Sequence, residues 1–283
     1  MVETTDGVGT YWDEMARFYW MTGAPLRPAR EDVRHFTRLA ARFVRRPSSG
    51  PLRALMLGVT PGYAGMAWPD HAELLAVDQS FAMVKGVWPG DVPGNRRAIC
   101  GDWLSLPLAD HSCHIVIADG SGNCVHFPEG LRRLAGEVAR VLRPGGFLLL
   151  RCYAQLEQKE NPACVLASLR DGASPSFHHF KFRLLMAMQE SAHRGVALAD
   201  VHRYWERSGI DPERLAEMMG WDLGVILAMD AYRDSPTVHV FPTLAQFRAV
   251  LGEYFGELSC SCAPYPLAER CPVLALRPIG GAR

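Results

Sequence analysis

The chain has 283 residues, of which 48% are hydrophobic and 21% charged, as in a globular protein with a substantial core. Basic and acidic residues balance at 30 each, so no excess of positive charge attracts nucleic acid. No apolar run approaches the roughly 18 residues of a membrane span. The eight cysteines form no CxxC pair, so we expect reduced thiols and no metal site. These features predict a cytoplasmic protein without a nucleic-acid or membrane partner.

The N-terminal residues 1–50 are predicted to form a helical segment. An aromatic-rich helix is expected over residues 10–21. A second helix is expected over 29–46, where apolar residues recur on one face. The sequence Pro-Ser-Ser-Gly-Pro at 47–51 then breaks the chain and marks a boundary.

From residue 51 onward, short apolar runs alternate with helical or loop segments. Strands are predicted at 53–59, 73–78, 96–102, 113–119 and 147–153, and a helix at 128–142. Strands this apolar on both faces are typical of a parallel sheet covered by helices on either side. The alternation predicts an α/β fold with a doubly wound, mostly parallel sheet.

The remainder of the chain divides into an insertion and a final α/β unit. Residues 155–240 are predicted to be helical and irregular, and they interrupt the domain of residues 51–283. A helix at 243–254 and strands at 256–262 and 272–278 complete the sheet. The insertion is rich in methionine, which suits either an apolar lid over a substrate or a homodimer interface.

Polar residues and glycines follow the predicted strands at the edge where open α/β sheets bind ligands. The first strand is followed by Gly58-Val59-Thr60-Pro61-Gly62, whose glycines allow close approach of a ligand. Asp78 ends the second strand, where a carboxylate can accept hydrogen bonds from the hydroxyls of a ribose. Asp102 and Trp103 follow the third strand, and Asp119 ends the fourth.

In these segments the chain resembles the class I S-adenosylmethionine-dependent methyltransferases. The resemblance covers about residues 53–153 and is carried by LMLGVTPG, AVDQS, GDWLSLPLADHSCHIVIAD and EVARVLRPGGFLLL, in the family's order and spacing. It implies a seven-stranded Rossmann-like sheet, S-adenosylmethionine as cofactor and S-adenosylhomocysteine as product. The residues that it assigns to the cofactor are Gly58, Thr60, Gly62, Asp78, Gln79, Gly101, Asp102, Trp103 and Asp119.

The first motif departs from the family at two positions. Met56 stands where the family has an acid, and Thr60 stands where it has its middle glycine. The missing carboxylate removes one anchor for the amino group of the cofactor. The Thr60 hydroxyl, backbone carbonyl groups or Asp119 could accept hydrogen bonds from that group instead.

The resemblance further implies methyl transfer to an oxygen or nitrogen of a small organic molecule. The candidates that contact this acceptor are Tyr11, Trp12, His126 and His178, although spacing singles out no catalytic base. His178 and His179 are adjacent, but adjacent side chains diverge, so we predict no metal there. The Asp-Gly-Ser-Gly loop after the fourth strand differs from the N/D-P-P-aromatic signature of DNA-base methyltransferases.

Two other readings remain distinct from a small-molecule enzyme. A non-catalytic cofactor-binding or scaffolding protein would keep the same fold and motifs. A protein methyltransferase is less favoured, because no acidic groove for a basic peptide is evident. A nicotinamide dehydrogenase is disfavoured, because GVTPG lacks the third glycine of the dinucleotide fingerprint.

Overall fold

The computed structural model describes residues 6–44, 50–68 and 72–279, and its N-terminal part is helical. The expected first helix divides into α1 (Asp6–Phe18) and the 3-10 turn η1 (Tyr19–Met21). Helix α2 spans Arg30–Phe43, and Asp32 caps its start by accepting a hydrogen bond from the Ala29 amide at 2.8 Å. The end of the predicted second helix, residues 45–46, and the predicted break at 47–49 lie outside the described residues.

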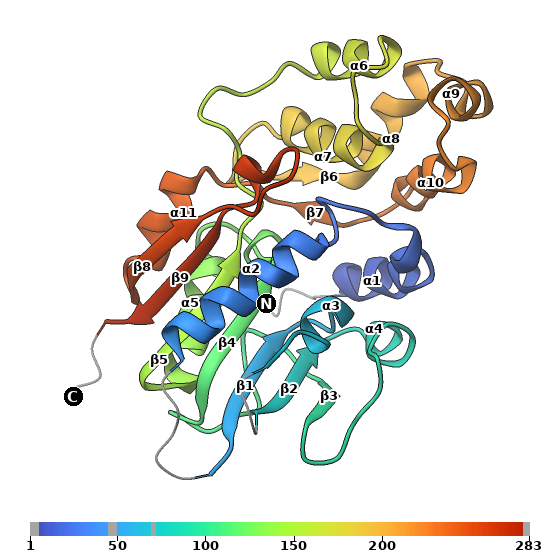
Figure 1. Cartoon of the computed structure of the whole chain (residues 1–283). Coiled ribbons are helices and arrows are strands. Elements are labelled where there is room, and N and C mark those ends of the chain that lie inside the picture. Colours follow the sequence, from blue (N-terminus) through green and yellow to red (C-terminus); the bar gives the residue numbers. More distant parts are fainter. Residues whose placement is uncertain (1–5, 45–49, 69–71, 280–283) are drawn as a thin grey trace.

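The expected sheet is confirmed, with seven strands in the order β3-β2-β1-β4-β5-β9-β8. Strands β1 to β5 pair in parallel, whereas β9 runs antiparallel to both β5 and β8 (Figure 1). The strands are β1 (Leu52–Leu57), β2 (Ala72–Asp78), β3 (Arg96–Cys100), β4 (Cys113–Asp119), β5 (Leu142–Arg151), β8 (Phe255–Ser261) and β9 (Val273–Pro278).

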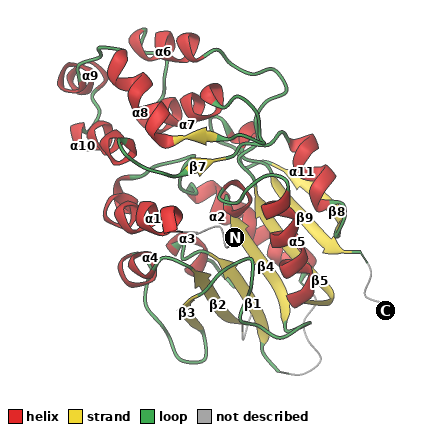
Figure 2. Ribbon diagram, turned by 180° about the vertical axis from the view of Figure 1, so that it is seen from behind, coloured by secondary structure: helices red, strands yellow, loops and turns green. Residues whose placement is uncertain are grey.

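Helices cover both faces of this sheet because side chains of successive strand residues point to opposite faces. Leu55 and Leu57 of β1 pack on the face covered by α5 (Glu129–Val141) and α11 (Leu244–Leu251). Ala54 and Met56 pack on the other face, with α2, α3 (Pro61–Ala64) and α4 (Phe81–Gly86). Figure 2 shows α5 and α11 on the side opposite to α2.

Residues 155–240 form a mainly helical layer at the carboxyl edge of the sheet (Figures 1 and 2). Its buried aromatic and aliphatic side chains make a separate hydrophobic core. Its elements are α6 (Pro162–Arg170), α7 (Phe177–Met188), α8 (Leu198–Arg207), α9 (Pro212–Met219), α10 (Leu223–Leu227) and η3 (Ala228–Tyr232). Two short antiparallel strands, β6 (Val196–Ala197) and β7 (Val238–His239), join the interior of the insertion to its end. These two strands were not predicted from the sequence.

Helix α1 lies between the insertion and the sheet (Figure 2). It packs against α4 on the sheet side and against η3 on the insertion side. Helix α1 is therefore part of the layer that covers the carboxyl edge of the sheet, whereas α2 packs on one face of the sheet. Among the helices of the described residues, none combines the length and the apolar character that crossing a bilayer requires.

Candidate functional site

Three of the predicted cofactor residues converge where β1, β2 and β3 end. Gly58 follows β1 with a φ of +96°, a conformation that favours glycine, and its amide donates a hydrogen bond to the Val77 carbonyl. A β-carbon at Gly58 would lie 3.9 Å from Asp78 Oδ2 and 3.9 Å from Trp103 Cζ2. Glycine, carboxylate and indole thus face one another at this edge.

Asp78 is buried at the end of β2 without a basic partner among the described residues. Its Oδ1 accepts a hydrogen bond from the Ser80 amide at 2.9 Å, and its Oδ2 faces Gly58. Burial raises the pKa of Asp78 to about 6, and the negative charge of Asp13 adds to this rise. A buried carboxylate without a cation is costly unless something else hydrogen-bonds to it, so Asp78 has the character of a ligand-binding acid.

Helix α1 reaches this edge through a side-chain hydrogen bond. The Ser80 hydroxyl donates to Asp13 Oδ1 at 2.6 Å while it caps α4 by accepting from the Met83 amide at 3.1 Å. The contact ties α1 to the turn that follows Asp78. Sequence reasoning did not identify Asp13 or Ser80, because their contact joins positions 67 residues apart.

The segment after β3 contributes an indole ring to the site. The Trp103 indole nitrogen donates a hydrogen bond to the Val77 carbonyl at 2.6 Å. Asp102 is exposed, and its Oδ1 accepts from the Leu104 amide within its own turn. The backbone of Gly101 adjoins Asp78, whereas the Gln79 side chain is exposed.

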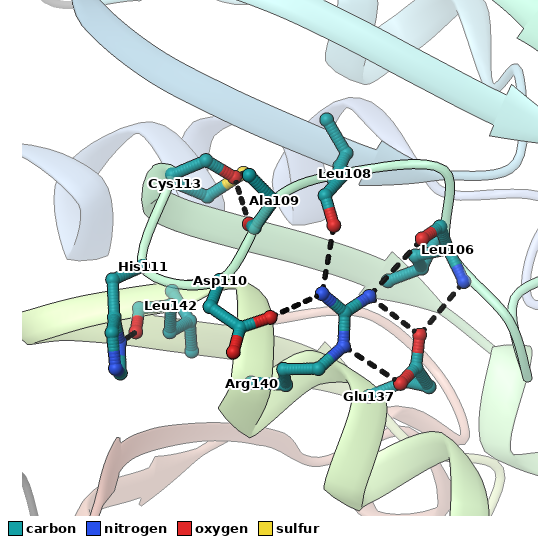
Figure 3. Close-up of polar contacts among 10 residues, drawn as sticks. Leu106, Leu108, Ala109, Asp110, His111, Cys113, Glu137, Arg140 and Leu142 are labelled. Carbon is teal, nitrogen blue, oxygen red and sulfur yellow. Dashed lines mark hydrogen bonds and ion pairs between the residues drawn. The ribbon is translucent and has the colours of Figure 1, made fainter.

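An arginine of α5 anchors the loop that carries Trp103 (Figure 3). The Arg140 guanidinium donates to the carbonyl oxygens of Leu106 and Leu108 and pairs with Glu137 and Asp110. Glu137 also accepts a hydrogen bond from the Leu106 amide at 2.8 Å. These bonds fix the β3–β4 loop on the helix behind the sheet.

The ends of β4 and β5 carry a buried ionic cluster centred on Arg151. Its Nε donates to Asp119 Oδ1 at 2.5 Å, and its Nη1 donates to Asp32 Oδ2 at 2.7 Å. The remaining donors reach the Pro25 carbonyl and the hydroxyl groups of Tyr153 and Tyr265. Arg151 has no exposed surface and attaches the N-terminal segment to the sheet.

Two tyrosine hydroxyl groups feel the charge of Asp119. Burial, and after it the negative charge of Asp119, raise the pKa of both Tyr19 and Tyr63. The hydroxyl oxygens of Tyr63 and Ser121 are buried without a hydrogen-bond partner. Buried polar atoms without partners are rare in folded proteins, and they mark this region as a place for a polar ligand.

Gly62 and Met56 both pack against neighbouring elements of the core. A β-carbon at Gly62 would lie 3.1 Å from Val33 Cγ2, so this glycine lets α2 approach α3. Met56 is buried in the core between the sheet and α2, at the position where the family has its acid. The geometry therefore gives Gly62 a packing role, whereas Gly58 faces the candidate site.

The structure separates the four predicted acceptor contacts. Tyr11 is buried and Trp12 half-buried beneath the insertion, with ring centroids 5.2 Å apart. His178 is half-buried against the backbone of Gly23, and burial lowers its pKa to about 4, with the charge of Lys181 second. His126 is exposed in the loop that follows β4, whereas the other three are at least half-buried.

The adjacent histidines have different partners, as adjacent side chains on a helix should. His179 Nδ1 lies 2.7 Å from the Ser176 hydroxyl at the start of α7. Within the residues that the structure describes, no three histidine, cysteine or acidic side chains gather as a metal site would require.

Comparison with known proteins agrees with this architecture. Residues 55–150 match the family model described as a methyltransferase domain. No curated protein matches the chain. The N-methyltransferase NodS from Bradyrhizobium japonicum WM9, solved with S-adenosylhomocysteine, has a TM-score of 0.52 and 12% identity, over 97% of this chain and 100% of that one.

Two further solved structures have the same fold. A chain from the complex of the Haloferax volcanii Trm112 methyltransferase activator with a methyltransferase has a TM-score of 0.51 and 13% identity, over 98% of this chain and 99% of that one. A protein from Rhodobacter sphaeroides described as a Zn-dependent alcohol dehydrogenase has a TM-score of 0.61 and 11% identity, over 98% and 100%. At these identities the likeness shows the fold alone. Residues 55–150 therefore resemble a methyltransferase domain, and the seven-stranded sheet that contains them has the Rossmann-like fold of methyltransferases.

Proposed function

We propose that the chain transfers a methyl group from S-adenosylmethionine to an oxygen or nitrogen of a small organic molecule. The observation that carries this proposal is the convergence of Gly58, Asp78 and Trp103 at the carboxyl edge of the sheet. A dinucleotide-binding sheet runs in the order 3-2-1-4-5-6. The insertion of antiparallel β9 between β5 and β8 favours the methyltransferase reading over a dehydrogenase.

The residues at the carboxyl edge of β1, β2 and β3 fit an adenosine-containing ligand. Asp78 offers a buried carboxylate oxygen toward Gly58, which suits the two hydroxyl groups of a ribose. The Trp103 ring adjoins the same space and suits the adenine. We assign Gln79, Gly101 and Asp102 to the outer side of the adenine, with Gly101 contributing backbone and Asp102 its free carboxylate oxygen.

The amino-acid end of the cofactor needs a partner for its ammonium group, because Met56 supplies none. Asp119 has one oxygen engaged by Arg151, and its other oxygen has no side-chain hydrogen-bond partner among the described residues. We assign that oxygen to the ammonium, together with the hydroxyl of Thr60. The unpaired hydroxyl groups of Tyr63 and Ser121 lie in the same region and can complete the shell.

Catalysis by this chain would consist mainly of binding and orientation. S-adenosylmethionine supplies, when bound, a methyl group on a sulfonium that is its own leaving group. Helix α1 and residues 155–240 cover the carboxyl edge and would keep water from the acceptor. We propose that residues 155–240 act as the substrate lid, with a homodimer interface as the competing role of the same surface.

The balanced charge and the covered edge support a small acceptor in place of a nucleic acid or a protein. Tyr11, Trp12 and His178 are the residues that we assign to this acceptor. His126 remains a candidate only if its loop turns inward on binding. We infer a cytoplasmic protein from its free cysteines, since thiols stay reduced in that compartment.

Incubation with S-adenosylmethionine and a library of small alcohols, phenols and amines tests the proposal. Mass spectrometry should detect S-adenosylhomocysteine together with one methylated acceptor. Binding of S-adenosylhomocysteine without any methylated product would favour the non-catalytic scaffold. Failure to bind either form of the cofactor would contradict both readings.

A further inference from the structure

Lys181 is a buried amine in helix α7 of the insertion. Its side chain is 2% exposed, although lysine is among the residues least often buried. It makes no hydrogen bond and no ion pair with any of the described residues. Its Nζ instead lies over the Tyr232 ring, 5.1 Å from the ring centroid. Burial alone lowers the pKa of Lys181 to about 8, so the amine remains mostly protonated at pH 7.

A second lysine of the chain, Lys85, lies near an aromatic ring without being buried. Lys85 Nζ lies 6.0 Å from the centroid of the Phe81 ring, yet this side chain is exposed. The contact of an ammonium with a ring therefore does not need burial. Placing Lys181 in the core costs solvation free energy that one ring returns only in part. A methionine of similar length would fill the same space without this cost.

Lys181 belongs to an aromatic layer that leads back to the candidate site. The centroids of the Tyr232 and Tyr11 rings lie 6.2 Å apart. The centroid of the Tyr11 ring lies 5.7 Å from that of the His239 ring. The amide of the next residue, Val240, donates a hydrogen bond to the Asn123 carbonyl in the turn after β4. Ring contacts therefore lead from the amine through Tyr232, Tyr11 and His239 to the turn that follows β4.

The chemistry of this layer is compatible with an apolar ligand that carries an acidic group. Its rings suit a flat hydrophobic body, and burial lowers the pKa of His239 to about 4, which leaves that imidazole neutral. The ammonium of Lys181 supplies a positive charge at the far side of the layer. One ammonium matches the single charge of a carboxylate better than the double charge of a phosphate.

We propose that Lys181 binds a carboxylate group of the methyl acceptor, which has an aromatic or similarly flat apolar body. This inference rests on the proposed function, because the acceptor is the ligand that would extend from Asp119 toward α7. The carboxylate would replace the Tyr232 ring as the partner of the ammonium. Lys181 is then a specificity-determining residue remote from the methylated atom, and it takes no part in the transfer.

The experiment uses the full chain loaded with S-adenosylhomocysteine. Aromatic carboxylates of one to two rings (benzoate, 4-hydroxybenzoate, indole-3-acetate and 2-naphthoate) are compared with their primary amides by calorimetry. We expect at least one acid to bind about tenfold more tightly than its amide, since a hydrogen bond between an ammonium and a carboxylate is stronger than one to a neutral amide. Lys181→Met should remove this preference, and Lys85→Met should keep it.

Two controls separate this inference from the proposed function and from misfolding. Lys181→Met should bind S-adenosylhomocysteine as the unmodified chain does and should melt at an equal or higher temperature, because a buried unpaired amine is gone. Loss of S-adenosylhomocysteine binding by the unmodified chain would refute the proposed function itself. The role of Lys181 is overturned if the chain binds the cofactor product but no acid of the set, if amides bind as well as acids, or if Lys181→Met keeps the preference.

Discussion

Asp78 and Asp119 end strands on either side of β1, and both are buried at the carboxyl edge of the sheet. Asp119 pairs with the Arg151 guanidinium, which also holds Asp32 and the N-terminal segment. Asp78 has no such cation among the described residues. A position at the end of a strand therefore does not by itself define a binding residue. An acid neutralised inside the protein belongs to the scaffold, at least in part, whereas an acid left without a cation is available to a ligand.

The largest effect is expected from removing the cation on the Asp119 side. Arg151→Met leaves two buried carboxylates without their partner, and breaking a buried ion pair costs about 3–5 kcal/mol. Denaturant unfolding should show a loss of stability of this size. The contact between the N-terminal segment and the sheet should loosen together with it, because Arg151 also donates to the Pro25 carbonyl.

Arg132 provides the matched control for Arg151. It binds both carboxylate oxygens of Glu253, at 2.8 and 3.0 Å, but its side chain is partly exposed. Arg132→Met should therefore cost less than about 1 kcal/mol. Equal losses for the two variants would show that burial does not distinguish the Asp119 cluster from a surface pair.

The Asp78 side should respond to pH in the range where that carboxyl titrates. Burial raises the pKa of Asp78 to about 6, and hydrogen bonds from ribose hydroxyls would stabilise its ionised form. Affinity for S-adenosylhomocysteine should thus be constant above pH 7. Below pH 6 it should fall by up to about tenfold per pH unit, until the lower pKa of the bound state is reached. Calorimetric titrations at pH values between about 5 and 8 measure this dependence.

Asp78→Asn is the control for the pH dependence, because it removes the titrating group and keeps its size. Its weaker affinity should not change between pH 5 and about 7. An unchanged slope in this variant would assign the titration to another group, such as a histidine.

A smaller effect is expected at the loop that carries Trp103. Arg140→Met removes hydrogen bonds to the Leu106 and Leu108 carbonyl oxygens along with partly exposed ion pairs. We expect a stability loss of about 1 kcal/mol. Affinity for S-adenosylhomocysteine should fall by about threefold, because Trp103 is held less firmly. Full affinity despite the lost stability would show that this anchor does not support the site.

The sheet and the position of Asp78 could be predicted from sequence because both depend on local pattern. Apolar runs mark the strands, and the residue that ends a parallel strand necessarily lies at its carboxyl edge. Gly58 follows the same logic. The predicted strand at 147–153 begins earlier, at Leu142, because the Arg-Pro-Gly-Gly turn already lies within β5.

The residues that sequence reasoning missed depend on partners distant in the chain. Arg151 looks like the polar end of an apolar strand until Asp32, 119 residues away, is seen beside it. Lys181 looks like a surface residue of a helix, and only the folded structure shows that it is buried beneath Tyr232 of η3. The role of Gly62 depends in the same way on Val33 of α2.

The most direct test of the account is a calorimetric titration of S-adenosylhomocysteine into three proteins at pH 8: the unmodified chain, Asp78→Asn and Asp102→Asn. Asp78→Asn should weaken binding by about tenfold to a hundredfold without loss of stability, since the ionised carboxylate is costly in the free protein. Asp102→Asn should have a much smaller effect, because that side chain is exposed and bonded to its own turn. Unchanged affinity of Asp78→Asn would contradict the central claim that the unneutralised acid of β2 holds the cofactor.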